Sequence, residues 1–235
     1  MAVRLRSCVL GSFALLASLT VAKAHADVRG VLRLGVLPLD VESSPDTPLF
    51  GDDVDRAVRA YNAAATAYDR AHGSATTPLT TSALGLSETL FTISPGIEAG
   101  TGPYFFRLEG MIGLGADLRS YGVGVYPLNL QTMLGREVAG YVSAGGTASV
   151  LDETSSGASG GLVTLRLAAG VRLAERIVIE LGFSAFVLGG VVDTERLQTM
   201  SMYDPRGETP PPAPDGAVEA GSGRGLVDVS VGLTF

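Results

Sequence analysis

The chain has 235 residues with 17 basic and 24 acidic side chains, a formal net charge of −7 that argues against the basic face of a nucleic-acid-binding protein. Its length suits one good-sized domain or two small ones. Only 17% of its residues are charged, while 46% are hydrophobic and 31 are glycine, which excludes disorder over most of the chain and is typical of buried strands or of contact with lipid.

The first 26 residues have the pattern of a secretory signal peptide. Two arginines near the start precede an uncharged run over residues 8–22, and the small-residue sequence AHA follows. We therefore expect export, cleavage after Ala26, and a mature domain of residues 27–235 that begins at Asp27. An uncleaved anchor is the alternative, but the apolar run is shorter than the ~20 residues of a membrane-spanning helix. Because Cys8 is the only cysteine, the cleaved chain would have no disulfide.

Eight later segments alternate apolar and polar residues with the period of two that predicts β-strands. The clearest is the last, RGLVDVSVGLTF. The fourth and fifth are the weakest, and Pro127 in the fourth predicts a bulge or a strand end. The segments cover residues 28–36, 88–99, 104–114, 121–130, 138–150, 161–173, 177–189 and 224–235.

The links between these segments alternate in length. Tight turns are expected at residues 100–103, 134–137 and 174–176, and longer links at 38–87, 115–120, 151–160 and 191–223. The alternation predicts an all-β fold, an eight-stranded antiparallel up-and-down barrel that spans a membrane with its longer loops at one end. In the first long link, the alanine-rich segment 52–72 has acidic residues at its start and basic residues at its end, which predicts a helix. The proline-rich segment 210–214 predicts an extended loop.

The two faces of the strands differ in polarity. Arg166 and Glu180 lie opposite aliphatic stripes, and an arginine that faces lipid at the bilayer midplane would cost about 2–4 kcal/mol. We therefore expect the stripes to face lipid, and a nearly balanced set of nine charged side chains to form a structural cluster inside. A soluble, lipocalin-like binding barrel with the stripes inside stays open as an alternative. The nine residues are Arg29, Arg33, Glu98, Arg107, Glu109, Arg166, Arg172, Glu180 and Asp228.

The last strand ends in Phe235, and the apolar positions before it are Val227, Val229, Val231 and Leu233. Here the chain resembles outer-membrane β-barrel proteins of Gram-negative bacteria, and as a whole it resembles the small, eight-stranded OmpA-like barrels. The resemblance implies an outer-membrane location, recognition of the last strand by the barrel-assembly machinery, and contact with membrane lipid and lipopolysaccharide. The chain departs from these barrels in having no tryptophan, a long helical first loop and no peptidoglycan-binding domain after the barrel.

Little in the sequence points to catalysis. After cleavage the chain keeps one histidine, His72, in the predicted helix, whereas acid–base chemistry usually needs histidine beside a serine or a carboxylate. We find no spacing typical of a metal or phosphate site. We expect no enzyme activity, no metal and no cofactor.

The expected function follows from the barrel. Eight strands enclose a space that side chains just fill, so we expect a monomer with a largely plugged interior and a structural or surface-interaction role. A porin-like narrow channel or small-solute transporter is the first alternative, because many inward positions are glycine or serine. A lipid-modifying enzyme of the outer membrane is another. The acidic outer loops suit divalent cations that bridge to lipopolysaccharide phosphates, or a basic partner.

Overall fold

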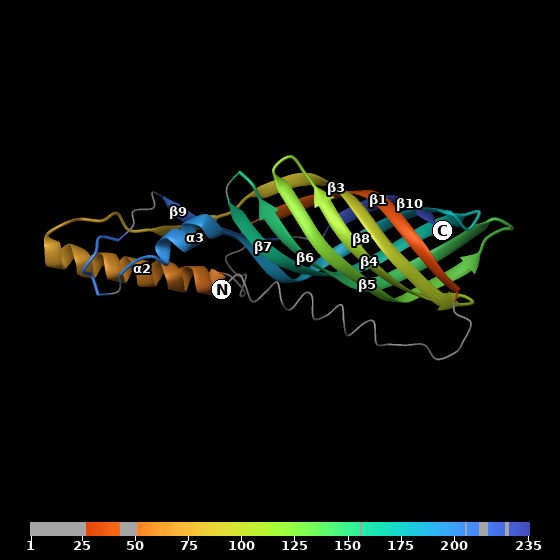
Figure 1. The fold of residues 1–235 in the computed structure, drawn as a ribbon, viewed down its shortest axis with the longest axis horizontal. Coiled ribbons are helices and arrows are strands. Elements are labelled where there is room, and N and C mark those ends of the chain that lie inside the picture. The colour runs from red at the N-terminus through yellow and green to blue at the C-terminus, as the bar shows by residue number, and fades with distance from the viewer. Residues whose placement is uncertain (1–26, 43–50, 156, 205, 212–215, 224–225) are drawn as a thin grey trace.

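An eight-stranded antiparallel barrel makes up most of the molecule (Figure 1), which confirms the predicted all-β barrel with eight strands. The computed structural model describes the chain except for residues 1–26, 43–50, 156, 205, 212–215 and 224–225. Strand β10 pairs with both β1 and β8 and so closes the wall. Around the barrel, the strands are β1 (Asp27–Glu42), β3 (Leu86–Thr101), β4 (Tyr104–Leu114), β5 (Leu118–Met133), β6 (Val138–Glu153), β7 (Ala158–Leu173), β8 (Ile177–Asp193) and β10 (Leu226–Thr234).

The weakly patterned fourth segment contains a β-bulge. The register between β5 and β6 shifts between Val125 and Leu128, and Pro127 lies inside the shift, as predicted. Because proline has no amide hydrogen to donate to a ladder, a bulge is where it fits best in a sheet. The side-chain amide of Asn129 donates to the carbonyl oxygens of Phe105 and Tyr126 at 2.7 Å each, which stabilises the bulge.

Two links expected to be longer are tight turns instead. Strand β5 begins at Leu118 and β6 continues to Glu153, so only residues 115–117 and 154–157 lie between strands there. The strands continue because inward-facing leucines at this level, among them Leu118 and Leu151, are buried in the barrel interior. The Glu88 carboxylate accepts hydrogen bonds from the amides of Ala116 and Leu118, which holds the β4–β5 turn against β3.

The two long links fold together into an extension beyond one end of the barrel. It contains α2 (Gly51–His72), β2 (Thr80–Ala83), α3 (Thr194–Met200) and β9 (Ala217–Gly223), and it forms the left part of Figure 1. The helix predicted over 52–72 is therefore confirmed. The predicted proline-rich loop falls largely outside the described residues. Of the helices in the described ranges, none is long and apolar enough to cross a membrane.

The extension has its own core and is joined to the wall by hydrogen bonds. Val58, Tyr61, Leu79, Met200 and Val218 are buried together between its elements. Strand β9 pairs with β2, with the end of β8 and with the end of β1. The extension therefore continues the barrel wall. We call this end of the barrel the extension end, and the opposite end, where β3–β4, β5–β6 and β7–β8 connect, the turn end.

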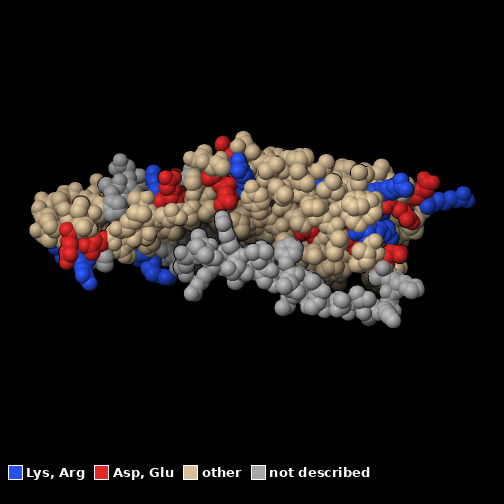
Figure 2. Space-filling view, viewed as in Figure 1, with Lys and Arg blue, Asp and Glu red and all other residues tan. Residues whose placement is uncertain are grey.

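The polarity of the wall reverses along its length. Over the middle and the turn end, the aliphatic stripes face outward, and Leu165 and Leu181 are 62% and 56% exposed. At the extension end, outward positions such as Thr89 and Asp152 are polar, while their inward neighbours Leu90 and Leu151 are buried. On the face drawn in Figure 2, charged side chains gather at the ends of the barrel and on the extension, and the wall between is largely tan.

Candidate functional site: an ion network across the barrel interior

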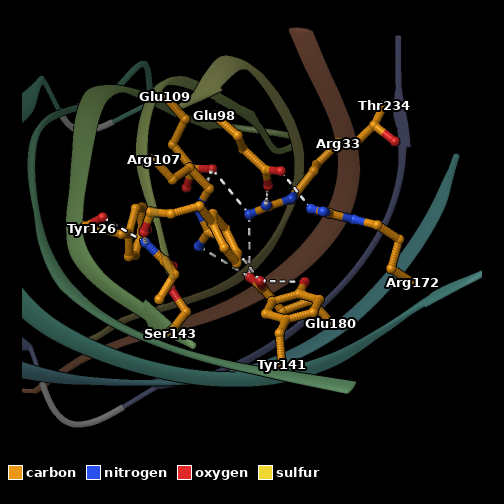
Figure 3. Close-up of polar contacts among 12 residues, drawn as sticks. Arg33, Glu98, Arg107, Glu109, Tyr126, Tyr141, Ser143, Arg172, Glu180 and Thr234 are labelled. Atoms are coloured by element: carbon orange, nitrogen blue, oxygen red, sulfur yellow. Dashed lines mark hydrogen bonds and ion pairs between the residues drawn. The ribbon is translucent and has the colours of Figure 1, made fainter. Parts of the chain in front are cut away.

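Eight charged side chains meet in the barrel interior and form what we call the ion network, and Figure 3 labels all of them except Arg166 and Asp228. They come from β1, β3, β4, β7, β8 and β10, because the period of two along each strand directs them to the same side of the wall. Four arginines face four carboxylates, so the network is balanced in formal charge. Its members are Arg33, Glu98, Arg107, Glu109, Arg166, Arg172, Glu180 and Asp228.

Glu180 is the centre of the network. Its carboxylate accepts hydrogen bonds at 2.7 Å from Arg107 Nη1 and from Arg166 Nη1, and at 3.3 Å from Arg33 Nη1. The hydroxyl of Tyr141 donates a further bond at 2.7 Å. The side chain of Glu180 is completely buried. Such a carboxylate is stable only because its charge is paired and its oxygens are hydrogen-bonded.

The remaining contacts extend the network across the barrel. Arg33 also lies 3.1 Å from Glu109 and 3.3 Å from Glu98, and Glu98 accepts a second bond from Arg172. Asp228 receives two hydrogen bonds from one guanidinium, that of Arg166. Because the network is balanced in formal charge, removal of any one charged member leaves a net charge in a buried cluster, which typically costs about 3–5 kcal/mol.

Aromatic rings and glycines complete the packing. The guanidiniums of Arg107 and Arg166 lie over the Tyr126 ring, at 3.9 Å and 5.7 Å from its centroid. Glycine is required where these groups approach the wall: a Cβ at Gly170 would meet the Tyr141 ring at 2.6 Å. Neither tyrosine belongs to the predicted charge cluster. The inward parity of Tyr141, shared with Ser143, is the one signal in the sequence that could have added it.

Arg29 is the one member of the predicted cluster that the structure does not bring into the network. It faces the interior near the turn end, and it has no ion pair with any residue in the described part of the chain. Asp27 begins β1, whereas Ala26 and the rest of the predicted signal peptide lie outside the described residues. The predicted outward pattern at the carboxyl terminus, Val227, Val229, Val231, Leu233 and Phe235, is exposed at every position.

A second group of buried side chains, which we did not predict from the sequence, fills the barrel interior toward the extension end. Buried leucines and valines from the strands fill the interior there, among them Leu39, Leu90, Leu118, Leu151 and Leu162. We call this group the apolar layer. A cavity of ≈ 70 Å³ lies between it and the ion network, and serine and threonine hydroxyls form part of its lining. The signal was the inward parity of these leucines, but most of them fell in segments expected to be loops.

His72 lies in the extension, and a group of two carboxylates beside a serine lies at the end of the neighbouring wall. His72 is exposed at the end of α2, where its ring stacks on Tyr68 with 4.2 Å between centroids. Asp152 and Glu153, expected in a loop, are the last two residues of β6. Glu153 accepts hydrogen bonds from the amide and the hydroxyl of Ser155. None of these contacts pairs a histidine with a serine or a carboxylate.

Comparison of the chain with known protein families and with curated proteins identified no relative. No family model matches the chain, and no curated protein matches it either.

Proposed function

We propose that this chain is an outer-membrane β-barrel protein with a closed interior, no catalytic activity, and a structural or surface-interaction role. The observation that carries the proposal is the reversal of polarity along the wall. From the middle to the turn end, the outward surface is apolar and the interior is ionic, which suits a wall surrounded by lipid. At the extension end the polarity is that of a water-soluble barrel, which suits a part that stands outside the membrane.

The height of the apolar band supports this reading. In β1, the outward apolar positions run from Val28 to Val36, and the partly exposed Asp40 follows. That band spans about nine residues, and a membrane-crossing β-strand needs roughly 9–11. A soluble lipocalin-like barrel would bury these stripes, and here Leu165 is 62% exposed.

The closed interior favours a structural or interaction role over transport. The ion network and the apolar layer occupy the interior at two levels, and between them the described residues line a cavity of ≈ 70 Å³. The folded extension is where we expect an external partner, divalent cations or lipopolysaccharide to bind. The exposed pattern that ends in Phe235 supports recognition by the barrel-assembly machinery, and the signal-peptide pattern supports export.

A narrow channel is the second candidate. The observation in its favour is that the cavity on one side of the ion network has a counterpart on the other, a polar recess of ≈ 190 Å³ at the turn end. An exchange of ion-pair partners in the network would be needed to join the two spaces.

The test is ion conductance of the refolded protein in planar lipid bilayers. Insertion is checked by the shift in gel mobility between unheated and boiled samples. We expect inserted protein without conductance steps. Discrete steps that change in size when Glu180 is replaced by Gln would favour the narrow channel. Protein that folds but does not insert would favour the soluble barrel.

A further inference from the structure

The barrel has a polar recess in its turn-end mouth that the ion network does not fill. Its volume is ≈ 190 Å³, and it lies on the far side of Glu98 and Arg172 from the cavity described above. Two further side chains that line it are Arg29 and Gln131, and Phe105 forms part of its apolar side. A space of this size admits a small polyatomic ion together with water.

One positive charge in this mouth has no ion-pair partner among the described residues. Arg29 lies directly opposite Glu98 in the β1–β3 register. Both oxygens of that carboxylate are already taken, Oε1 by Arg33 and Oε2 by Arg172. The ion network is balanced without Arg29, so this arginine adds a positive charge beside the recess, where the exposed Asp27 is the other charged side chain outside the network. It is half-buried, so solvent screens its charge less than that of a surface arginine.

A second hydrogen-bond donor beside the recess, the Nε–H of Arg172, also lacks an acceptor among the described residues. Arg172 is 2% exposed, and its Nη1 and Nη2 donate to Gln131 and Glu98. Its Nε–H has no hydrogen-bond partner in the part of the chain that the structure describes. A buried guanidinium N–H without an acceptor is costly, and an oxyanion in the recess would remove that cost after a small shift of the Arg172 side chain that brings its buried Nε–H within reach. Figure 3 shows Arg172 extended toward Glu98 and Arg33.

We propose that the turn-end recess binds a small oxyanion of the phosphate or carboxylate class. Arg29 is its principal ligand, and the Nε–H of Arg172 is a second donor. Arginine suits this task because its planar fork of N–H groups matches the oxygens of phosphate and carboxylate. Asp27, which also lines the recess, opposes the anion by its negative charge. The oxyanion arrives as a free ion or as the headgroup of an anionic lipid.

The test is a titration of the refolded protein in a sugar-headgroup detergent that contains no phosphate. Sodium phosphate and sodium acetate are compared with sodium chloride at equal ionic strength. Binding is measured by calorimetry and by the NMR resonances of the arginine Nε–H groups. We expect saturable shifts with an oxyanion and none with chloride. If phosphate shifts are suppressed by added phosphatidylglycerol, the lipid headgroup is the source; if they persist, it is the free ion.

Matched variants separate the recess from general charge effects. Arg29→Gln is expected to weaken oxyanion affinity about tenfold or more, because it removes a charged donor. Arg136→Gln removes an exposed arginine in the β5–β6 turn at the same end and is expected to change nothing. Asp27→Asn is expected to strengthen binding. Each variant is first shown to be folded by gel mobility. Equal responses to chloride and oxyanions, or unchanged affinity in folded Arg29→Gln, would overturn the proposal.

Discussion

The guanidinium carbon of Arg107 lies 3.9 Å from the centroid of the Tyr126 ring, and Arg107 is completely buried. We expect Tyr126→Leu to lower the free energy of unfolding by about 2 kcal/mol, since a desolvated cation–π contact is lost. Tyr126→Phe keeps the ring and should lose much less. Urea unfolding in detergent micelles measures both, with Tyr121→Leu on the outward face as a control. Equal losses for the Phe and Leu variants would contradict the cation–π explanation.

Replacement of Glu180, the central carboxylate, should lower the free energy of unfolding by more than the loss of the cation–π contact does. Glu180→Gln leaves three arginines around a neutral side chain, and we expect the free energy of unfolding to fall by about 3–5 kcal/mol. Glu175→Gln, in the exposed β7–β8 turn, is the matched control and should lie within about 0.5 kcal/mol of the wild type. The measurement is again the urea midpoint in micelles. An unchanged midpoint for Glu180→Gln would mean that the arginines are already satisfied by other groups.

If lipid surrounds the apolar band and the extension end stands outside the membrane, the cost of an outward-facing charge depends on its position along the wall. Leu165→Arg places a charge in the exposed apolar band and should cost about 2–4 kcal/mol of membrane stability. Thr89→Arg, in the polar outward ring at the extension end, should be tolerated. Both are measured as the fraction that folds into lipid vesicles. Arg166→Ala should still insert, because its side chain faces inward. Insertion of both arginine variants at the same yield would remove the basis for the boundary.

The end of α2 should respond to acid. The pKa of Asp69 is held below its ordinary value of 3.8 by hydrogen bonds from the Ser74 hydroxyl and the Thr76 amide. A carboxyl whose folded pKa is lowered stabilises the fold fully above its unfolded pKa, and this contribution is lost as the pH falls through the folded value. We expect the Thr76 amide resonance to move in a transition below pH 3.8. The transition should vanish in Asp69→Asn, and its persistence there would assign it to another group.

The number of strands and the side of the wall for each charge could be predicted because alternation of period two fixes both at once. Arg33, Arg107 and Glu180 are inward for this reason alone. The parts of the strands near the extension end were not predicted, because the polarity of the wall reverses there. Inward leucines such as Leu118 alternate with outward polar residues, and we interpreted these segments as loops. The sequence could not predict that Arg29 lies outside the network. That outcome depends on which guanidiniums contact Glu98 in the folded barrel, and these are Arg33 and Arg172.

The pairing of β9 with the barrel wall places the extension, and with it helix α2, beyond the end of the barrel. With 22 residues at a rise of 1.5 Å each, α2 is about 33 Å long, and it runs lengthwise beyond the barrel (Figure 1). Strand β9 pairs with both β1 and β8, which attaches the extension to two strands of the wall. Seated in an outer membrane as proposed, the extension would place a bound partner well beyond the lipid headgroups.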